Sequence, residues 1–138
     1  MSDLEHARLM LSAARKGLRA LEGMEDQERF ADEVFGFHAQ QAVEKTLKAW
    51  ASSAGIVYPK IHDLQELFAL LGDRGQTAPE RFLTLADLTD YAVQFRYEAF
   101  EDSGNELERL EVLGQVRELV EYVEGLIGPS AAAPWLGP

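Results

Sequence analysis

The chain has 138 residues and no cysteine, so it can form neither a disulfide nor a thiolate metal site. Its 24 acidic and 13 basic side chains give a formal net charge of −11, which argues against sequence-independent binding to DNA or RNA. No apolar run reaches the roughly 18 residues that a membrane span needs, and the acidic N-terminus does not resemble a signal peptide. We therefore expect one globular domain, located in the cytoplasm.

The first half of the chain predicts two long helices. Ser2 and Glu5 have the spacing of a capping box, and apolar residues then recur every three or four positions as far as Gly23, as they do on an amphipathic helix. A second helix is expected over residues 28–54. Gly55 is suited to end it in a left-handed conformation.

The second half predicts three further helices. Asp63 is the expected N-cap of a short helix, and Thr77 with Glu80 is the expected capping box of the next one. A last helix is predicted over residues 106–127, with this apolar stripe: Leu110, Leu113, Val116, Val120, Val123 and Ile127.

No segment alternates with the period of two that a strand requires. The fold class that follows is all-α. We predict an up-and-down antiparallel bundle of four to five helices over residues 1–127. A mobile tail rich in Gly, Pro and Ala is expected over residues 128–138.

The second helix carries a polar row beside the stripe that is expected to face the core. That stripe consists of Ala31, Phe35, Ala39, Ala42, Val43, Thr46, Ala49 and Trp50. The spacings of three, four and three along this row place its side chains on one flank of the helix; they are His38, Gln41, Lys45 and Lys48. Two interpretations stay open. The row could hold an anion such as a phosphate group. Alternatively, its lysines could pair with carboxylates of a neighbouring helix, with Gln41 and His38 bridging.

Three segments in order resemble the HEPN family of small helical bundles: AQQAVEKTLKAW at 39–50, YPKIHDLQEL at 58–67 and YAVQFRYE at 91–98. The resemblance implies a helical bundle that forms a homodimer. In the branch of the family that pairs with minimal nucleotidyltransferases, it implies a domain that binds a nucleotide or a nucleotide substrate. The chain departs from the family pattern at Glu98, where proline is frequent.

Another branch of the family consists of RNases in which an arginine is followed, after four to six residues, by a histidine. Arg96 is the matching arginine, but no histidine occurs after His62. Because the imidazole would transfer the proton in such a cleavage, the resemblance implies a non-catalytic role. An RNase toxin acting through Arg96 is the disfavoured alternative.

The leading hypothesis is therefore a nucleotide-binding module that acts with a separately encoded nucleotidyltransferase, as in a toxin–antitoxin pair. The expected nucleotide- or anion-binding residues are Gln41, Lys45, Lys48, Lys60 and Arg96. The supporting positions of the family pattern are Glu44, His62, Asp63 and Tyr97. For these residues the structural alternatives are a helix cap at Asp63, an internal pair between Arg96 and Glu44, and packing by Tyr97.

No metal or cofactor is expected, because the three histidines do not share a helix turn and no thiolate is present. A second alternative is a pure protein-interaction scaffold, whose acidic surface would meet a basic partner. For the homodimer, the sequence offers Phe30, Val34 and Phe37, which lie off the main apolar stripe of the second helix.

Overall fold

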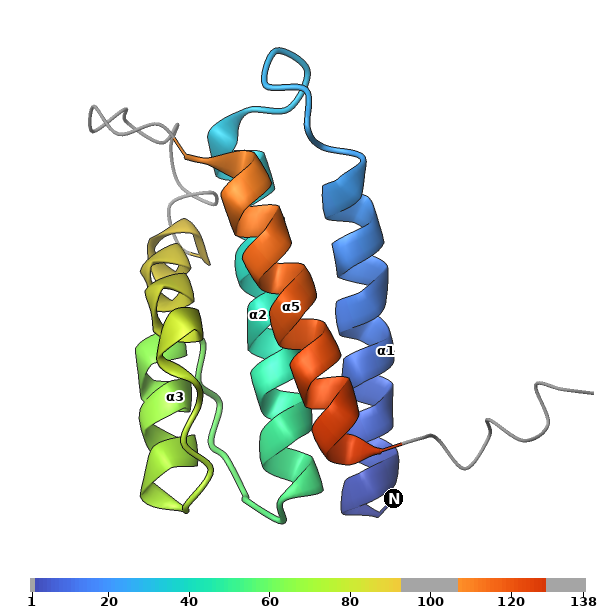
Figure 1. Cartoon of the computed structure of the whole chain (residues 1–138), viewed down its shortest axis with the longest axis vertical. Coiled ribbons are helices and arrows are strands. Elements are labelled where there is room, and N and C mark those ends of the chain that lie inside the picture. Colours follow the sequence, from blue (N-terminus) through green and yellow to red (C-terminus); the bar gives the residue numbers. More distant parts are fainter. Residues whose placement is uncertain (1, 93–106, 129–138) are drawn as a thin grey trace, which may run out of the picture.

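The computed structural model describes residues 2–92 and 107–128 (Figure 1). In this part of the chain all regular structure is helical. The elements are α1 (Asp3–Glu22), α2 (Asp32–Ser53), α3 (Leu64–Asp73), the 3-10 helix η1 (Glu80–Asp90) and α5 (Arg109–Ile127). The predicted all-α bundle is confirmed. The predicted tail lies outside the described residues except for Gly128.

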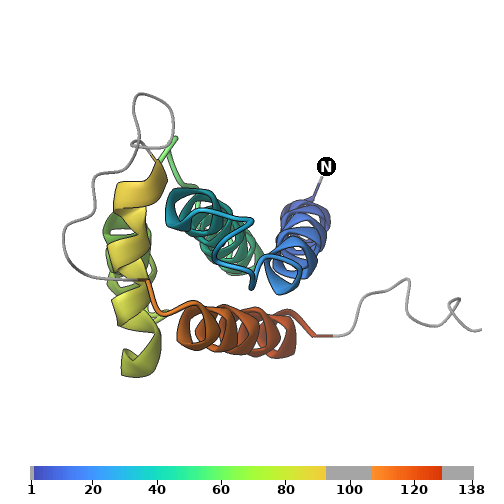
Figure 2. The same ribbon diagram turned by 90° about the horizontal axis from the view of Figure 1, so that it is seen from above.

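The long helices α1 and α2 form an antiparallel pair, and α5 packs across both of them (Figures 1 and 2). On its other side, α2 is covered by α3 and η1. The extended segment 54–63 runs back along α2, so that His62 lies beside Glu44 in the middle of that helix. As a result α3 runs in the same direction as α2, and its end reaches Trp50 through Gln76. None of the described helices combines the length and the apolar character that crossing a membrane demands.

Helix α2 is the centre of the bundle, and none of its residues is fully exposed. The apolar stripe predicted for it is buried from Phe35 to Trp50, while Ala31 stands before the helix as its N-cap and is exposed. Gly36 lets η1 approach, because a Cβ at this position would lie 2.3 Å from the ring of Tyr91. The absence of a side chain there fixes how closely the C-terminal end of η1 packs on α2.

The predicted helix ends at Ser2, Gly55 and Asp63 are confirmed. Ser2 and Glu5 form a capping box at the start of α1, and Asp63 accepts hydrogen bonds from two backbone amides at the start of α3. Gly55 has a φ of 75°. The amide of Ile56 donates to the carbonyl of Ala51 at 2.9 Å, and that of Gly55 donates to the carbonyl of Ser52 at 3.0 Å, which together make a Schellman ending.

The predicted capping box of Thr77 and Glu80 is wrong. The helix begins at Glu80 with Pro79 as its N-cap, and no side chain caps it. The fixed backbone angle of proline sets the start of this helix, so the threonine hydroxyl is not needed there. The helix is of the 3-10 type over Glu80–Asp90.

The predicted starts of the second and last helices are also corrected. Residues 27–30 form a turn in which the carboxylate of Asp26 accepts hydrogen bonds from two backbone amides, so α2 begins at Asp32. Helix α5 begins at Arg109, and Leu110 is 70% exposed. At this end of α5 it is the side chain of Arg109 that turns inward.

Candidate functional site

The polar row of α2 is divided by burial. His38, Gln41 and Lys45 are half-buried, whereas Lys48 is only 9% exposed. The ammonium of Lys48 lies 2.8 Å from the Oε2 atom of Glu44. The two lysines of the row therefore have different environments. Lys48 is paired with a carboxylate of its own helix and not, as expected, of a neighbouring one, because residues four apart lie one above the other on a helix.

Glu44 is the centre of a polar cluster that we call the Glu44 cluster (Gln40, Gln41, Glu44, Lys48 and His62). Glu44 is 5% exposed. The Nε2 atom of Gln40 donates to its Oε1 at 2.9 Å, and the Nδ1 atom of His62 lies 3.2 and 3.1 Å from its two oxygens. Together with Lys48, these contacts satisfy a carboxylate that would otherwise be costly to bury.

The hydrogen bonds of the Glu44 cluster also determine the protonation state of the Glu44 carboxyl group. Burial acts to raise the pKa of Glu44, but hydrogen bonds from Lys48, Gln40 and His62 and the charge of Lys48 outweigh it and hold this pKa below its ordinary value. The carboxylate is therefore ionised at neutral pH. It supplies a fixed negative charge beneath the half-buried flank of α2.

Gln40 connects the Glu44 cluster to the segment that precedes α3. Its Nε2 atom also donates to the backbone carbonyl of His62 at 3.1 Å, and its Oε1 atom accepts from Gln41 at 2.8 Å. Gln40 is fully buried, and it was not among the predicted site residues. The spacing of Gln40, Glu44 and Lys48 could have indicated its role, because residues four apart lie one above the other on a helix.

Tyr58 covers Lys48 from the other side. The Lys48 ammonium lies 5.5 Å from the centroid of the Tyr58 ring, and the Tyr58 hydroxyl is 2.9 Å from Nε2 of His6 on α1. The carboxylate of Glu44 and the ring of Tyr58 both contact this lysine, and Tyr58 connects it to α1. The ammonium of Lys48 therefore interacts with groups inside the bundle.

Three polar groups of the predicted site remain accessible. Lys45 is half-buried and Lys60 is exposed, and neither makes a hydrogen bond or ion pair with a described residue. The side chain of His62 is 67% exposed, and the ring turns Nδ1 towards Glu44. In contrast, Asp63 is occupied as the cap of α3, with its Oδ1 atom 2.8 Å from the amide of Gln65.

Arg96 and Tyr97 lie outside the described residues, so the predicted pair between Arg96 and Glu44 stays a prediction. Glu44 is already satisfied by three described side chains.

Comparison with known families is decisive for the fold. The model of the HEPN domain matches residues 4–126, nearly the whole chain. The chain belongs to the HEPN family. No curated protein and no solved structure matches it in the corresponding comparisons.

The described side chains of this HEPN domain include groups that can bind an anion. Within residues 2–92 and 107–128, no three histidine or carboxylate side chains gather in a way that could hold a metal ion. The sequence has no histidine after His62, so Arg96 lacks the partner that the RNase members of the family use. What the Glu44 cluster offers is an ordered imidazole and nearby cations that can bind an anion.

Arg109 is a further buried charge of the HEPN bundle that was not predicted from the sequence. Arg109 is 4% exposed. Its guanidinium donates to the carbonyls of Met24 and Phe30 and lies 2.9 Å from the carboxylate of Asp32. These bonds tie the connection between α1 and α2 to the start of α5, which is a structural role.

Proposed function

We propose that this HEPN domain is a non-catalytic binding module for a nucleotide, or for the nucleotide end of a substrate. It acts with a separately encoded nucleotidyltransferase, as the partners of a toxin–antitoxin pair do. One observation carries the proposal. Lys45 is half-buried beside the Glu44 cluster and has no counter-ion among the described residues, while Lys48 on the same helix has one.

Each accessible group has a role in this proposal. Lys45 and Lys60 supply positive charge to the phosphate groups. His62 is held by Glu44 through Nδ1, which leaves Nε2 to meet a phosphate oxygen. Gln41 donates to Gln40, and its own side-chain oxygen, which accepts no hydrogen bond from a described residue, can accept one from a base.

Lys48 contributes indirectly in this arrangement. By neutralising Glu44 it keeps the carboxylate from repelling phosphate and holds it in place for His62. Arg96 is retained in the proposal as a further phosphate contact. Its neighbour Tyr97 is retained as a supporting residue.

The catalytic metal site is assigned to the partner. The sequence of this chain has no Gly-Ser motif followed by paired aspartates of the kind that nucleotidyltransferases use to bind Mg²⁺. The module itself is proposed to act as a homodimer. Phe30, Val34 and Phe37 are half-buried and supply apolar surface for the contact between two copies.

The test is calorimetric titration of the purified chain with ATP and with GTP, with and without Mg²⁺, at two salt concentrations. Saturable binding that weakens with salt is expected. Lys45→Glu is expected to weaken it by roughly tenfold or more, because it replaces a charge-assisted contact by a repulsive one. Lys45→Gln should have a smaller effect.

Arg74→Glu is the matched control, since Arg74 is exposed at the end of α3 and undergoes the same change in charge. Unchanged affinity in Lys45→Glu, or an equal loss in Arg74→Glu, would refute the assignment of the site. If the chain releases no heat with any nucleotide, the nucleotide function itself is wrong.

The pairing of Lys48 with Glu44 favours a second candidate function, a protein-interaction scaffold. Here the Glu44 cluster only positions α3, and the acidic surface binds a basic partner protein. This function predicts no nucleotide affinity and a partner complex whose dissociation constant rises steeply with salt. The same titration separates the two functions.

A further inference from the structure

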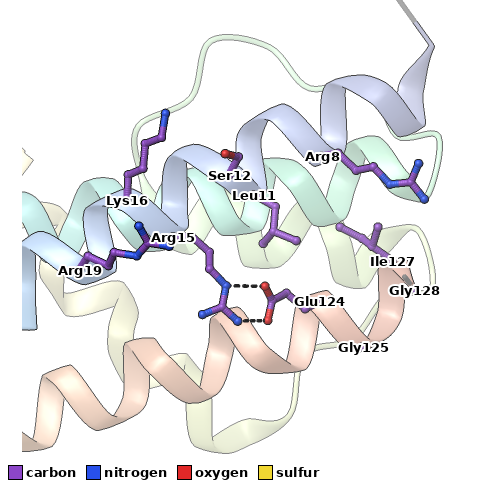
Figure 3. Close-up of a pocket in the computed structure, with 10 residues that line it drawn as sticks. All are labelled: Arg8, Leu11, Ser12, Arg15, Lys16, Arg19, Glu124, Gly125, Ile127 and Gly128. Carbon is purple, nitrogen blue, oxygen red and sulfur yellow. Dashed lines mark hydrogen bonds and ion pairs between the residues drawn. The ribbon is translucent and has the colours of Figure 1, made fainter. Parts of the chain in front are cut away.

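A groove lies between α1 and α5, away from the Glu44 cluster (Figure 3). Its volume is about 610 Å³, within the range of roughly 300–1,000 Å³ that is common for sites of small ligands. It is lined by Arg8, Leu11, Ser12, Arg15, Lys16, Arg19, Glu124, Gly125, Ile127 and Gly128. Every one of these residues belongs to the described part of the chain.

The charge of this groove is opposite to that of the protein. Its lining contains four cationic side chains, all from α1, and one carboxylate, that of Glu124. Arg8, Arg15 and Arg19 share one face of α1 because they are spaced by seven and four positions, while Lys16 lies at the margin of this face (Figure 3). On a chain with a net charge of −11, such a local concentration of positive charge selects for a small anion.

Arg15 is fixed in the middle of the groove. Its Nε atom donates to Oε2 of Glu124 at 2.5 Å, and its Nη2 atom donates to Oε1 of the same carboxylate (Figure 3). The hydrogen bonds from Arg15 to Glu124 raise the pKa of the guanidinium, so it remains charged. Its third nitrogen, Nη1, is not used by Glu124 and is available to a ligand.

The groove also has an apolar part. Leu11 and Ile127 are half-buried and face each other across the two helices (Figure 3). Beside them is Gly125, where a Cβ would meet nothing within 4 Å. Side chains therefore leave open space next to an apolar surface, with Arg19 at one end of the groove and Arg8 at the other.

We propose that the groove between α1 and α5 is a second binding site, for a small molecule that carries a phosphate group on an apolar body. The phosphate lies against Arg15 and Arg19, and the apolar body packs on Leu11 and Ile127. A dianionic phosphate matches a lining with four cations and one carboxylate better than a single carboxylate does. Nucleic acid does not fit, because the acidic remainder of the chain repels a long phosphate backbone.

This site does not depend on the proposed nucleotide site on α2. The groove uses one face of α1 and the end of α5, whereas Lys45, Lys60 and His62 belong to α2 and the segment before α3. The two proposed sites therefore share no residue, and the amide signals that a ligand shifts distinguish them.

The test is a titration of the full chain with phenyl phosphate, followed by nuclear magnetic resonance of the backbone amides. Inorganic phosphate, benzyl alcohol and benzoate are titrated in parallel. Phenyl phosphate is expected to bind most tightly and to shift the amide signals of α1 and of the end of α5. Arg19→Glu is expected to weaken this binding by roughly tenfold or more.

Two further variants sharpen the result. Gly125→Leu places a side chain in the open part of the groove and should abolish binding of phenyl phosphate, while circular dichroism shows the helices intact. Arg117→Glu is the matched control, since Arg117 is half-buried on α5, pairs with Glu22 and does not line the groove.

The proposal is overturned if phenyl phosphate binds no better than inorganic phosphate or than benzoate. It is also overturned if Arg19→Glu and Gly125→Leu bind as the unmodified chain does, or if Arg117→Glu loses as much affinity as Arg19→Glu. Amide shifts confined to α2 and the segment before α3 would place the phosphate there and not in the groove.

Discussion

Glu44 on α2 and Arg109 on α5 are both charged and both almost completely buried, yet their partners differ in kind. Arg109 donates to the backbone carbonyls of Met24 and Phe30 and to one carboxylate. Among the described residues, Glu44 is bound by side chains alone, those of Gln40, Lys48 and His62. Arg109 is therefore held mainly by backbone carbonyls, whereas Glu44 is held by side chains, which can change rotamer.

This difference in partners indicates a structural role for Arg109 and a role at the candidate binding site for Glu44. The partners of Arg109 exist only when the connection between α1 and α2 is folded onto α5, so Arg109 stabilises that arrangement. Among the partners of Glu44 is an imidazole whose side chain is mostly exposed. Through His62, the buried charge of Glu44 orients a group at the surface, where a ligand can meet it.

The largest expected effect comes from Glu44→Leu. It removes the charge that satisfies the buried ammonium of Lys48, and breaking a buried ion pair from one side costs about 3–5 kcal/mol of unfolding free energy. Urea unfolding followed by circular dichroism measures this loss. Glu118→Leu, at an exposed position of α5, should change the unfolding free energy by less than about 0.5 kcal/mol. A loss below about 1 kcal/mol in Glu44→Leu would mean that Lys48 finds water or another partner easily.

A smaller loss is expected for Arg109→Met, about 2–3 kcal/mol. The side chain of Asp32 is 34% exposed, so this carboxylate can be hydrated once its partner is gone. The effect should be local, with faster amide hydrogen exchange in residues 23–31 than elsewhere. Arg117→Met removes an exposed pair and should cost less than about 1 kcal/mol. Uniformly faster exchange along the chain would contradict the local role of Arg109.

The fold could be predicted to a large extent because it depends on local patterns. The apolar stripe from Phe35 to Trp50, the glycine at position 55 and the cap at Asp63 each act within one helix or at its end, and each is confirmed. The prediction that Leu110 belongs to the buried stripe was wrong, because the neighbouring Arg109 occupies the buried position at the start of α5 and leaves Leu110 exposed. Periodicity alone does not reveal that a charged side chain will find buried carbonyls.

The site was less predictable because it depends on contacts between distant segments. The pairing of Lys48 with Glu44 was visible as a spacing of four, but the contact of His62 with Glu44 requires the chain to run back along α2. The basic face of α1 could have been read from Arg8, Arg15 and Arg19. That it borders a groove depends on α5, more than a hundred residues later in the chain.

The smallest expected effect distinguishes the two buried charges by pH. Hydrogen bonds hold the folded-state pKa of Glu44 below its ordinary value, so the stability contributed by its ionised form is fully present above that ordinary value. The contribution is lost as the pH falls through the lower folded-state pKa. Arg109 is the comparison, because it is held mainly by backbone carbonyls, which do not titrate.

The measurement is the difference in unfolding free energy between the unmodified chain and Glu44→Gln, taken by urea unfolding at several pH values from 7 to 3. Both proteins keep Lys48 and His62, so the difference reports the Glu44 carboxylate. It should be constant above about pH 5 and shrink steadily below it. The difference between the unmodified chain and Arg109→Met should decline less, because Arg109 is held mainly by backbone carbonyls and only one of its partners is a carboxylate. If both differences fall in parallel, the acid sensitivity belongs to the other carboxylates of the chain, and the hydrogen bonds to Glu44 do not stabilise its ionised form.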